Sequence, residues 1–166
     1  MNTIHRFAGI FALVLAMSGC SNNNSPMSAD KTDFTAQLSG GEQVPAVATA
    51  ASGSATFWLN SEGTELHYKL TVSGLNNVTM AHLHFGAFGQ NGAPVAWLYP
   101  SAPPAKEING VSNGVLSAGT ITAGDLAGPM AGKTIADLAA AIREHNIYVN
   151  VHTEAYADGE IRGQLR

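Results

Sequence analysis

The chain has 166 residues, of which 45% are hydrophobic and 12% charged, and its formal net charge is −4. This composition is that of one globular domain and excludes a disordered chain or a coiled coil. Lysine and arginine are few and unclustered, so we expect no nucleic acid partner bound through phosphate contacts. The 18 glycines favour many short strands joined by turns.

Residues 1–19 are predicted to be an export signal and not part of the fold. Arg6 gives a weakly basic start, and the apolar run that follows is too short to span a bilayer. Small residues precede Cys20, the single cysteine of the chain. The pattern resembles a bacterial lipoprotein signal, which implies that Cys20 is lipidated and begins the mature chain. An ordinary secretory signal with an incidental cysteine is the alternative.

The cell envelope is the location that this signal implies. Ser21 after the cysteine resembles the sorting signal of outer-membrane lipoproteins in a Gram-negative cell. Such a signal is compatible with a domain on either the periplasmic or the outer face of that membrane. Residues 20–33 carry almost no apolar side chains and are predicted to be a flexible tether. The folded domain is then expected over residues 34–166.

Alternating polar and apolar residues predict antiparallel strands through this domain. The first strand begins at Phe34 and ends at the Gly40–Gly41 turn. Gly74 to Asn77 is predicted to be a second turn, directly before a strand that carries two histidines. Further strands are predicted at residues 54–59, 66–72, 95–99, 111–121, 148–152 and 160–165. The expected fold class is mainly β, a single antiparallel sandwich or barrel-like domain.

One short helix is predicted in the C-terminal half, from Thr134 to His145. Thr134 suits the N-cap with Asp137 three positions later, apolar residues recur at helical spacing, and Asn146 can end the helix. We expect this helix to cover an open end of the sheet.

His82 and His84 lie one residue apart in the histidine-bearing strand. In an extended strand both side chains point to one face, while Leu83 points to the other and packs in the core. Such a pair presents two imidazoles to one metal ion, but it is equally a simple polar face. A metal site therefore needs a further ligand.

The C-terminal hairpin supplies a third histidine on a polar face. Tyr148, Asn150 and His152 share that face, and if His152 pairs with Glu160, then Asn150 meets Arg162. Tyr148, Asn150, Glu160 and Arg162 are therefore predicted to support the histidine site from the same face.

Two interpretations of the three histidines stay open. If the strand of His152 lies beside that of His82, the imidazoles converge, and three nitrogen donors suit copper or zinc. The alternative, which the sequence favours, is a structural network in which His82 and His84 hydrogen-bond the carbonyls of the 86–92 loop. Further candidate ligands are His67, Tyr68, Glu160 and, at the helix end, His145.

No catalytic set is apparent in the sequence. There is no Gly-x-Ser-x-Gly motif and no phosphate-binding loop. Asp158 and Glu160, at the start of the last predicted strand, are not expected to work as a paired acid and base. We therefore expect no enzyme activity.

Four segments resemble the CHRD family, the domain named from chordin. They are FTAQLSGGEQVPAV at 34–47, AHLHFGAFGQNGAPVAWL at 81–98, DLAAAIREHNIYVNVHT at 137–153 and DGEIRGQL at 158–165. The resemblance implies an extracytoplasmic, mostly antiparallel β-sandwich or barrel-like domain with no established catalytic activity. The chain departs from the family pattern at Glu144-His145, where family members often have a small residue and glycine.

A second similarity, of architecture alone, is to copper-zinc superoxide dismutases, which place a His-x-His strand and a later histidine around copper. His82, His84 and His152 match that order, but the disulfide cysteines and a zinc loop are missing. The sequence thus predicts a lipid-anchored, non-enzymatic binding or envelope-associated module with an unidentified protein or glycan partner. The alternative is a copper or zinc protein that uses the three histidines, with copper redox activity.

Overall fold

The computed structural model describes residue 1 and residues 32–166. The predicted export signal, the lipidation site Cys20 and most of the tether therefore lie outside the described residues. Within them, no helix is long and apolar enough to cross a membrane. The elements are β1 Phe34–Ser39, β2 Ser52–Leu59, β3 Glu65–Phe85, β4 Pro94–Tyr99, β5 Ile108–Thr122, α1 Ile135–Arg143, β6 Ile147–Thr153 and β7 Ile161–Gln164, with short 3-10 turns at 40–42, 123–125 and 128–130.

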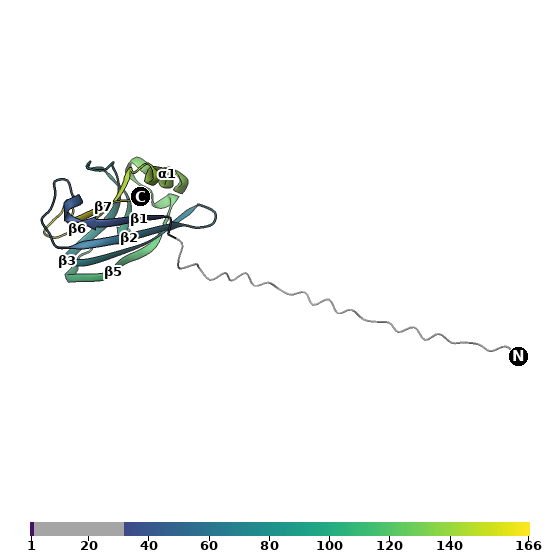
Figure 1. Cartoon of the computed structure of the whole chain (residues 1–166), viewed down its shortest axis with the longest axis horizontal. Coiled ribbons are helices and arrows are strands. Elements are labelled where there is room, and N and C mark those ends of the chain that lie inside the picture. Colours follow the sequence, from purple (N-terminus) through teal and green to yellow (C-terminus); the bar gives the residue numbers. More distant parts are fainter. Residues whose placement is uncertain (2–31) are drawn as a thin grey trace.

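The seven described strands form one antiparallel sheet in the order β2-β1-β7-β6-β3-β4, and β5 pairs with β3. A further pairing of β2 with β3 joins the order back on itself, so that β1, β2, β3, β6 and β7 make a closed ring of neighbours. The prediction of a mainly β, barrel-like domain with one helix is confirmed (Figure 1).

Side-chain alternation explains how the ring closes around a core. In β1 and β2, Ala36 lies opposite Ala55, and both are buried together with Phe57. Leu66 and Leu70 of β3 belong to the same buried cluster. Burial of these apolar rows on one face of each strand is the main contribution to the stability of the sheet.

The predicted turn at Gly74–Asn77 is wrong, because β3 runs without interruption through it. Gly74 and Asn77 have positive φ angles of 73° and 50°, and the pairing of β3 with β5 shifts register at both places. Leu75 and Val78 are nevertheless fully buried, and the Asn77 side chain accepts a hydrogen bond from the backbone N–H of Gly110. Two bulges therefore bend one long strand where a reversal was expected.

The helix is shorter than predicted, because its last helical residue is Arg143, two residues before His145. Thr134 is the N-cap and forms the expected capping box with Asp137. At the other end, His145 adopts a φ of 57°, while its N–H and that of Asn146 bond to carbonyls of the last helical turn. This is a Schellman ending, whose left-handed position favours glycine.

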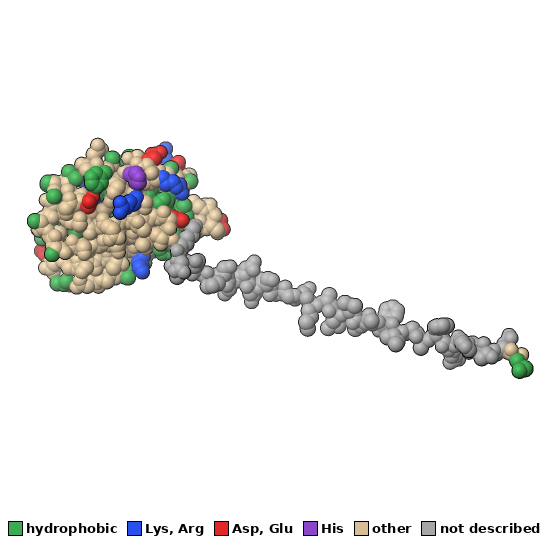
Figure 2. All heavy atoms as spheres, viewed as in Figure 1, with side chains coloured by type: hydrophobic (Ala, Val, Ile, Leu, Met, Phe, Trp, Pro, Cys, Tyr) green, Lys and Arg blue, Asp and Glu red, His purple; other side chains and the backbone are tan. Residues whose placement is uncertain are grey.

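The helix lies beside the beginning of the first strand, where the Arg143 guanidinium is 5.4 Å from the ring centre of Phe34 (Figure 1). On the face shown in Figure 2, lysine and arginine side chains are scattered among neutral surface and form no continuous basic patch.

Candidate metal centre

The three histidines come from two neighbouring strands. In the pairing of β3 with β6, His82 lies opposite Asn150, His84 opposite Tyr148, and His152 opposite Met80. Alternate residues of both strands therefore point to one face. The condition on which the metal interpretation depends, that the strand of His152 lies beside that of His82, is therefore met.

The imidazoles converge into a compact cluster. One ring nitrogen from each of His82, His84 and His152 lies within 4.8 Å of the others. Nδ1 of His82 is 3.3 Å from Nε2 of His152. This contact is a hydrogen bond between the two rings, and its length is close to the separation of about 3.3 to 3.4 Å between two ligands that lie about 2.0 to 2.1 Å from a tetrahedral ion.

Backbone carbonyls fix the protonation of two of the rings. Nδ1 of His84 donates to the Gly92 oxygen at 2.9 Å, and Nδ1 of His152 donates to the Ala157 oxygen at 2.8 Å. A carbonyl oxygen only accepts, so in each neutral ring Nε2 carries the lone pair. A histidine that binds a metal ion usually makes this kind of contact with its second nitrogen.

Two nitrogens of the cluster have no partner. Nε2 of His82 and Nε2 of His84 are buried and make no hydrogen bond to any described residue. Buried polar atoms are almost always bonded, and an unbonded one costs about 1 to 3 kcal/mol. A network that served only to hold the loop would leave both nitrogens unpaired.

The cluster is neutral at physiological pH. The exposed fractions of His82, His84 and His152 are 4%, 8% and 6%. Burial, with the neighbouring His152 and His84 adding to it, lowers the pKa of His82 to about 3. Burial also lowers the pKa of His84 to about 4 and that of His152 below its usual value, although the carbonyl contacts oppose the shift. Protons therefore do not compete with a metal ion near pH 7.

Aromatic rings hold the imidazoles in place. Trp97 of β4 lies edge-on to His82 with 4.2 Å between ring centres, and Tyr148 stacks on His84 at 5.0 Å. The sequence reasoning did not single out Trp97. Its alternation in β4 with the buried residues Ala96 and Leu98 is the signal that would have placed it toward the polar face.

Arg162 supports the site through Tyr148. The predicted pairing of Asn150 with Arg162 is confirmed, and the guanidinium lies 3.5 Å from the ring centre of Tyr148. The side chain is 2% exposed and donates to the oxygens of Asn91, Ala87 and Gln90, all of them neutral groups. Arg162 thus places a buried positive charge against the Tyr148 ring, which in turn stacks on His84.

Asn150 and Glu160 lie on the polar face as predicted, but neither bonds to a histidine. Asn150 accepts from Gln43 at 2.7 Å and donates to the Asp158 carbonyl at 3.0 Å. The carboxylate of Glu160 accepts from the hydroxyls of Thr49 and Thr153, both at 2.8 Å. The expectation that Glu160 adds a fourth ligand is therefore wrong, since both its oxygens are occupied elsewhere.

The other candidate ligands also lie outside the cluster. The Tyr68 hydroxyl donates to the Leu98 carbonyl, and His67 bonds to the Thr120 hydroxyl. His145 occupies the left-handed position after α1 and is exposed. Their proposed ligand roles are wrong for the geometric reason that strand and helix place them away from the β3–β6 polar face.

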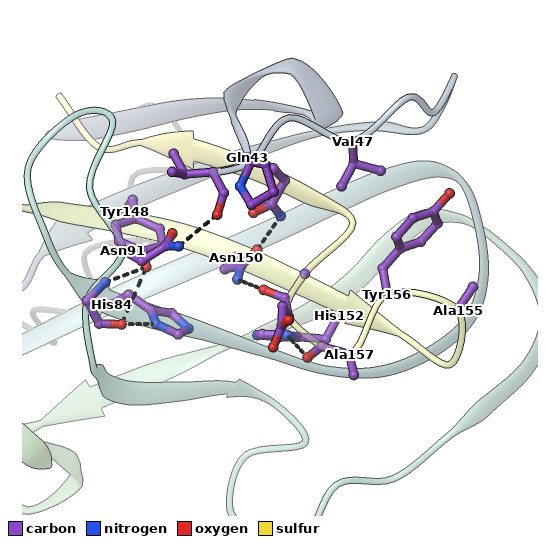
Figure 3. A pocket seen from close by; sticks show the side chains of 15 residues that line it. Gln43, Val47, His84, Asn91, Tyr148, Asn150, His152, Ala155, Tyr156 and Ala157 are labelled. Carbon is purple, nitrogen blue, oxygen red and sulfur yellow. Dashed lines mark hydrogen bonds between the residues drawn. The ribbon is translucent and has the colours of Figure 1, made fainter.

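A cavity of about 640 Å³ opens beside the cluster and is lined by His84 and His152, among others (Figure 3). Its wall includes Gly159, which has a φ of 120° and approaches the Asn150 side chain so closely that a Cβ would clash with it. The segment around Gln43 forms another wall, which the sequence reasoning did not connect with the histidines.

The sequence model of the CHRD domain matches residues 34–165. The chain belongs to the CHRD domain family. All three clustered histidines lie within the matched part of this CHRD domain. Comparison with curated proteins and with solved structures gives no match.

Proposed function

We propose that this CHRD domain binds one copper or zinc ion through His82, His84 and His152. The observation that carries the proposal is the convergence of one ring nitrogen from each histidine within 4.8 Å, with the buried Nε2 of His84 left unpartnered among the described residues. An ion at the centre of the cluster would make that nitrogen a ligand and remove the cost of leaving it unpaired. A set of three imidazoles suits copper and zinc better than calcium or magnesium, which prefer oxygen ligands.

The competing role, a purely structural network, has one observation in its favour. His84 does bond to the Gly92 carbonyl, which is the loop contact expected from the sequence. That bond uses only Nδ1, however, and the same contact serves a metal ligand equally well. The metal interpretation accounts for both nitrogens of the ring.

We further propose that the domain acts at the cell envelope as a non-enzymatic binding module, anchored by a lipid on Cys20. The sequence around Cys20 supports the anchor, and the tether that follows would separate the domain from the membrane. The metal site and the anchor are independent parts of the proposal, and each is tested separately.

The metal site is tested by counting bound ions. Full-length protein in detergent is stripped with a chelator, loaded with copper or zinc, dialysed and analysed for metal. We expect about one equivalent for the wild type and none for His84→Ala. His67→Ala is the matched control, because His67 lies on the same strand outside the cluster. Retention of the ion by a folded His84→Ala protein would refute the site.

A further inference from the structure

The cavity reaches the histidine cluster from one side. His84 and His152 line it, whereas His82 is not among its lining residues and packs against Trp97. An ion held by the three nitrogens would therefore have the packed His82 and Trp97 rings on one side and the cavity on the other. Structural zinc sites are closed by four protein ligands, while sites that accept an external ligand keep one position open.

The charges around this position do not balance. All three imidazoles are neutral ligands, and no carboxylate joins their cluster among the described residues. Arg162 adds a buried positive charge whose hydrogen-bond partners are all neutral. The carboxylate of Glu160, held by two threonines on the same polar face, carries the opposite charge to Arg162, and Asp158 on the cavity wall is exposed to water, which screens its charge. A divalent ion held by three neutral imidazoles would thus add two positive charges for which the cluster has no anionic ligand.

We propose that the metal ion in this site takes its fourth ligand from the cavity and that this ligand is a small anion. The inference rests on the proposed metal site. A single anionic donor atom would fill the open position and reduce the uncompensated charge of the ion, which is costly in a buried site, and the Arg162 charge would favour an anion there. Inorganic anions and the carboxylate of a small organic acid share this chemistry, and the cavity of about 640 Å³ admits either.

Azide is a direct probe, because its bond to Cu(II) gives a charge-transfer absorption band. Full-length protein is loaded with copper, the metal is counted, and azide is then titrated. We expect saturation at one azide per copper. Acetate is then added as a competitor. If acetate displaces azide, the site also binds carboxylates, and if acetate has no effect, the site binds inorganic anions only. A protein that holds one copper but gives no azide band has a closed site, which overturns the inference and leaves the proposed function intact.

The role of charge is tested with Arg162→Met. This variant should weaken azide binding by at least about fivefold while the affinity for neutral imidazole stays the same, since only the anion interacts with the guanidinium charge. Arg162→Lys, which keeps the charge, is the matched control and should retain azide binding. Equal changes for azide and imidazole, or no change for either, would contradict the charge argument.

A second variant covers the case in which Arg162→Met does not fold. Val47 is half-buried on the cavity wall, so Val47→Trp should fill the space without touching a histidine. We expect this variant to keep one copper and lose azide binding. If azide binds Val47→Trp as it binds the wild type, the ligand does not enter through this cavity, and the inference is wrong. Loss of copper from the wild type itself would instead refute the proposed function.

Discussion

At the residue scale, the backbone oxygens of Gly92 and Ala157 hold the rings of His84 and His152 with Nε2 unprotonated. Strand alternation predicted that His82 and His84 share one face and that His152 lies on a polar face of another strand, but their convergence depends on the pairing of β3 with β6, which the sequence left open. The carbonyl partners could not be predicted, since they lie in loops whose backbone direction no periodic pattern specifies. These contacts leave the lone pair of each ring on Nε2, which is the arrangement that a metal ligand needs.

The lowered histidine pKa values predict a pH-dependent stability for the metal-free protein. His82 and His84 have folded pKa values of about 3 and about 4, against an ordinary value of 6.5. As pH falls below about 6.5, the unfolded chain binds protons that the folded chain does not, so the free energy of unfolding decreases. Each histidine contributes up to about 1.4 kcal/mol per pH unit until its folded pKa is reached.

Urea unfolding of chelator-treated protein at about pH 7, 6 and 5 measures this slope. His82→Gln should show a shallower loss of stability over the same range, because one buried imidazole is gone. His67→Gln, which changes a histidine of the same strand outside the cluster, should keep the wild-type slope. An equal slope in His82→Gln and wild type would contradict the assignment of that proton uptake to His82.

At the scale of elements, the strands and the helix were largely predictable, and the errors have local causes. Gly74 and Asn77 are residues typical of turns, and both do adopt positive φ angles. Leu75 is nevertheless fully buried, and β5 pairs along the same stretch. Burial and pairing with a distant strand therefore overrode the local turn preference, which a reading of neighbouring residues does not detect.

The end of α1 gives a stability prediction. His145 has a φ of 57°, a conformation that costs a residue with a Cβ about 1 to 2 kcal/mol but costs glycine little. His145→Gly should therefore raise the free energy of unfolding by about 0.5 to 1 kcal/mol after the larger chain entropy of glycine is subtracted. Thermal unfolding monitored by circular dichroism measures the change.

Glu144→Gly is the matched control for this helix end. Glu144 precedes His145 and has an ordinary φ of −82°, so glycine there gains nothing and should lower stability. If both glycine variants lower the melting temperature, the left-handed position of His145 is not strained, and this explanation of the helix end is wrong.

At the scale of the whole molecule, the sequence predicted a single mainly β domain, and the family match spans residues 34–165. The closure of the sheet through the β2–β3 pairing was harder to predict from the sequence, because strand order depends on contacts between segments far apart in the chain. The cavity could not be predicted for the same reason. Its walls combine the Gln43 segment, the loop containing Gly92 and the turn before β7, which only the fold brings together.

The lipid anchor is a prediction about the whole protein. Cys20→Ala should move the protein from the membrane fraction to the soluble fraction, because the residue that receives the lipid is lost. Cell fractionation with detection of the domain measures this shift. Ser21→Asp is an informative control, since it should keep the lipid but move the protein from the outer to the inner membrane. A Cys20→Ala protein that stays in the membrane fraction would contradict the anchor.

The most direct measurement of the central claim is anomalous X-ray scattering at the copper or zinc edge, from crystals of the metal-loaded protein. We expect one strong peak with a nitrogen of His82, His84 and His152 each at about 2.0 to 2.1 Å. A peak bound by other residues, or no peak at the cluster in protein that carries one equivalent of metal, would contradict the account.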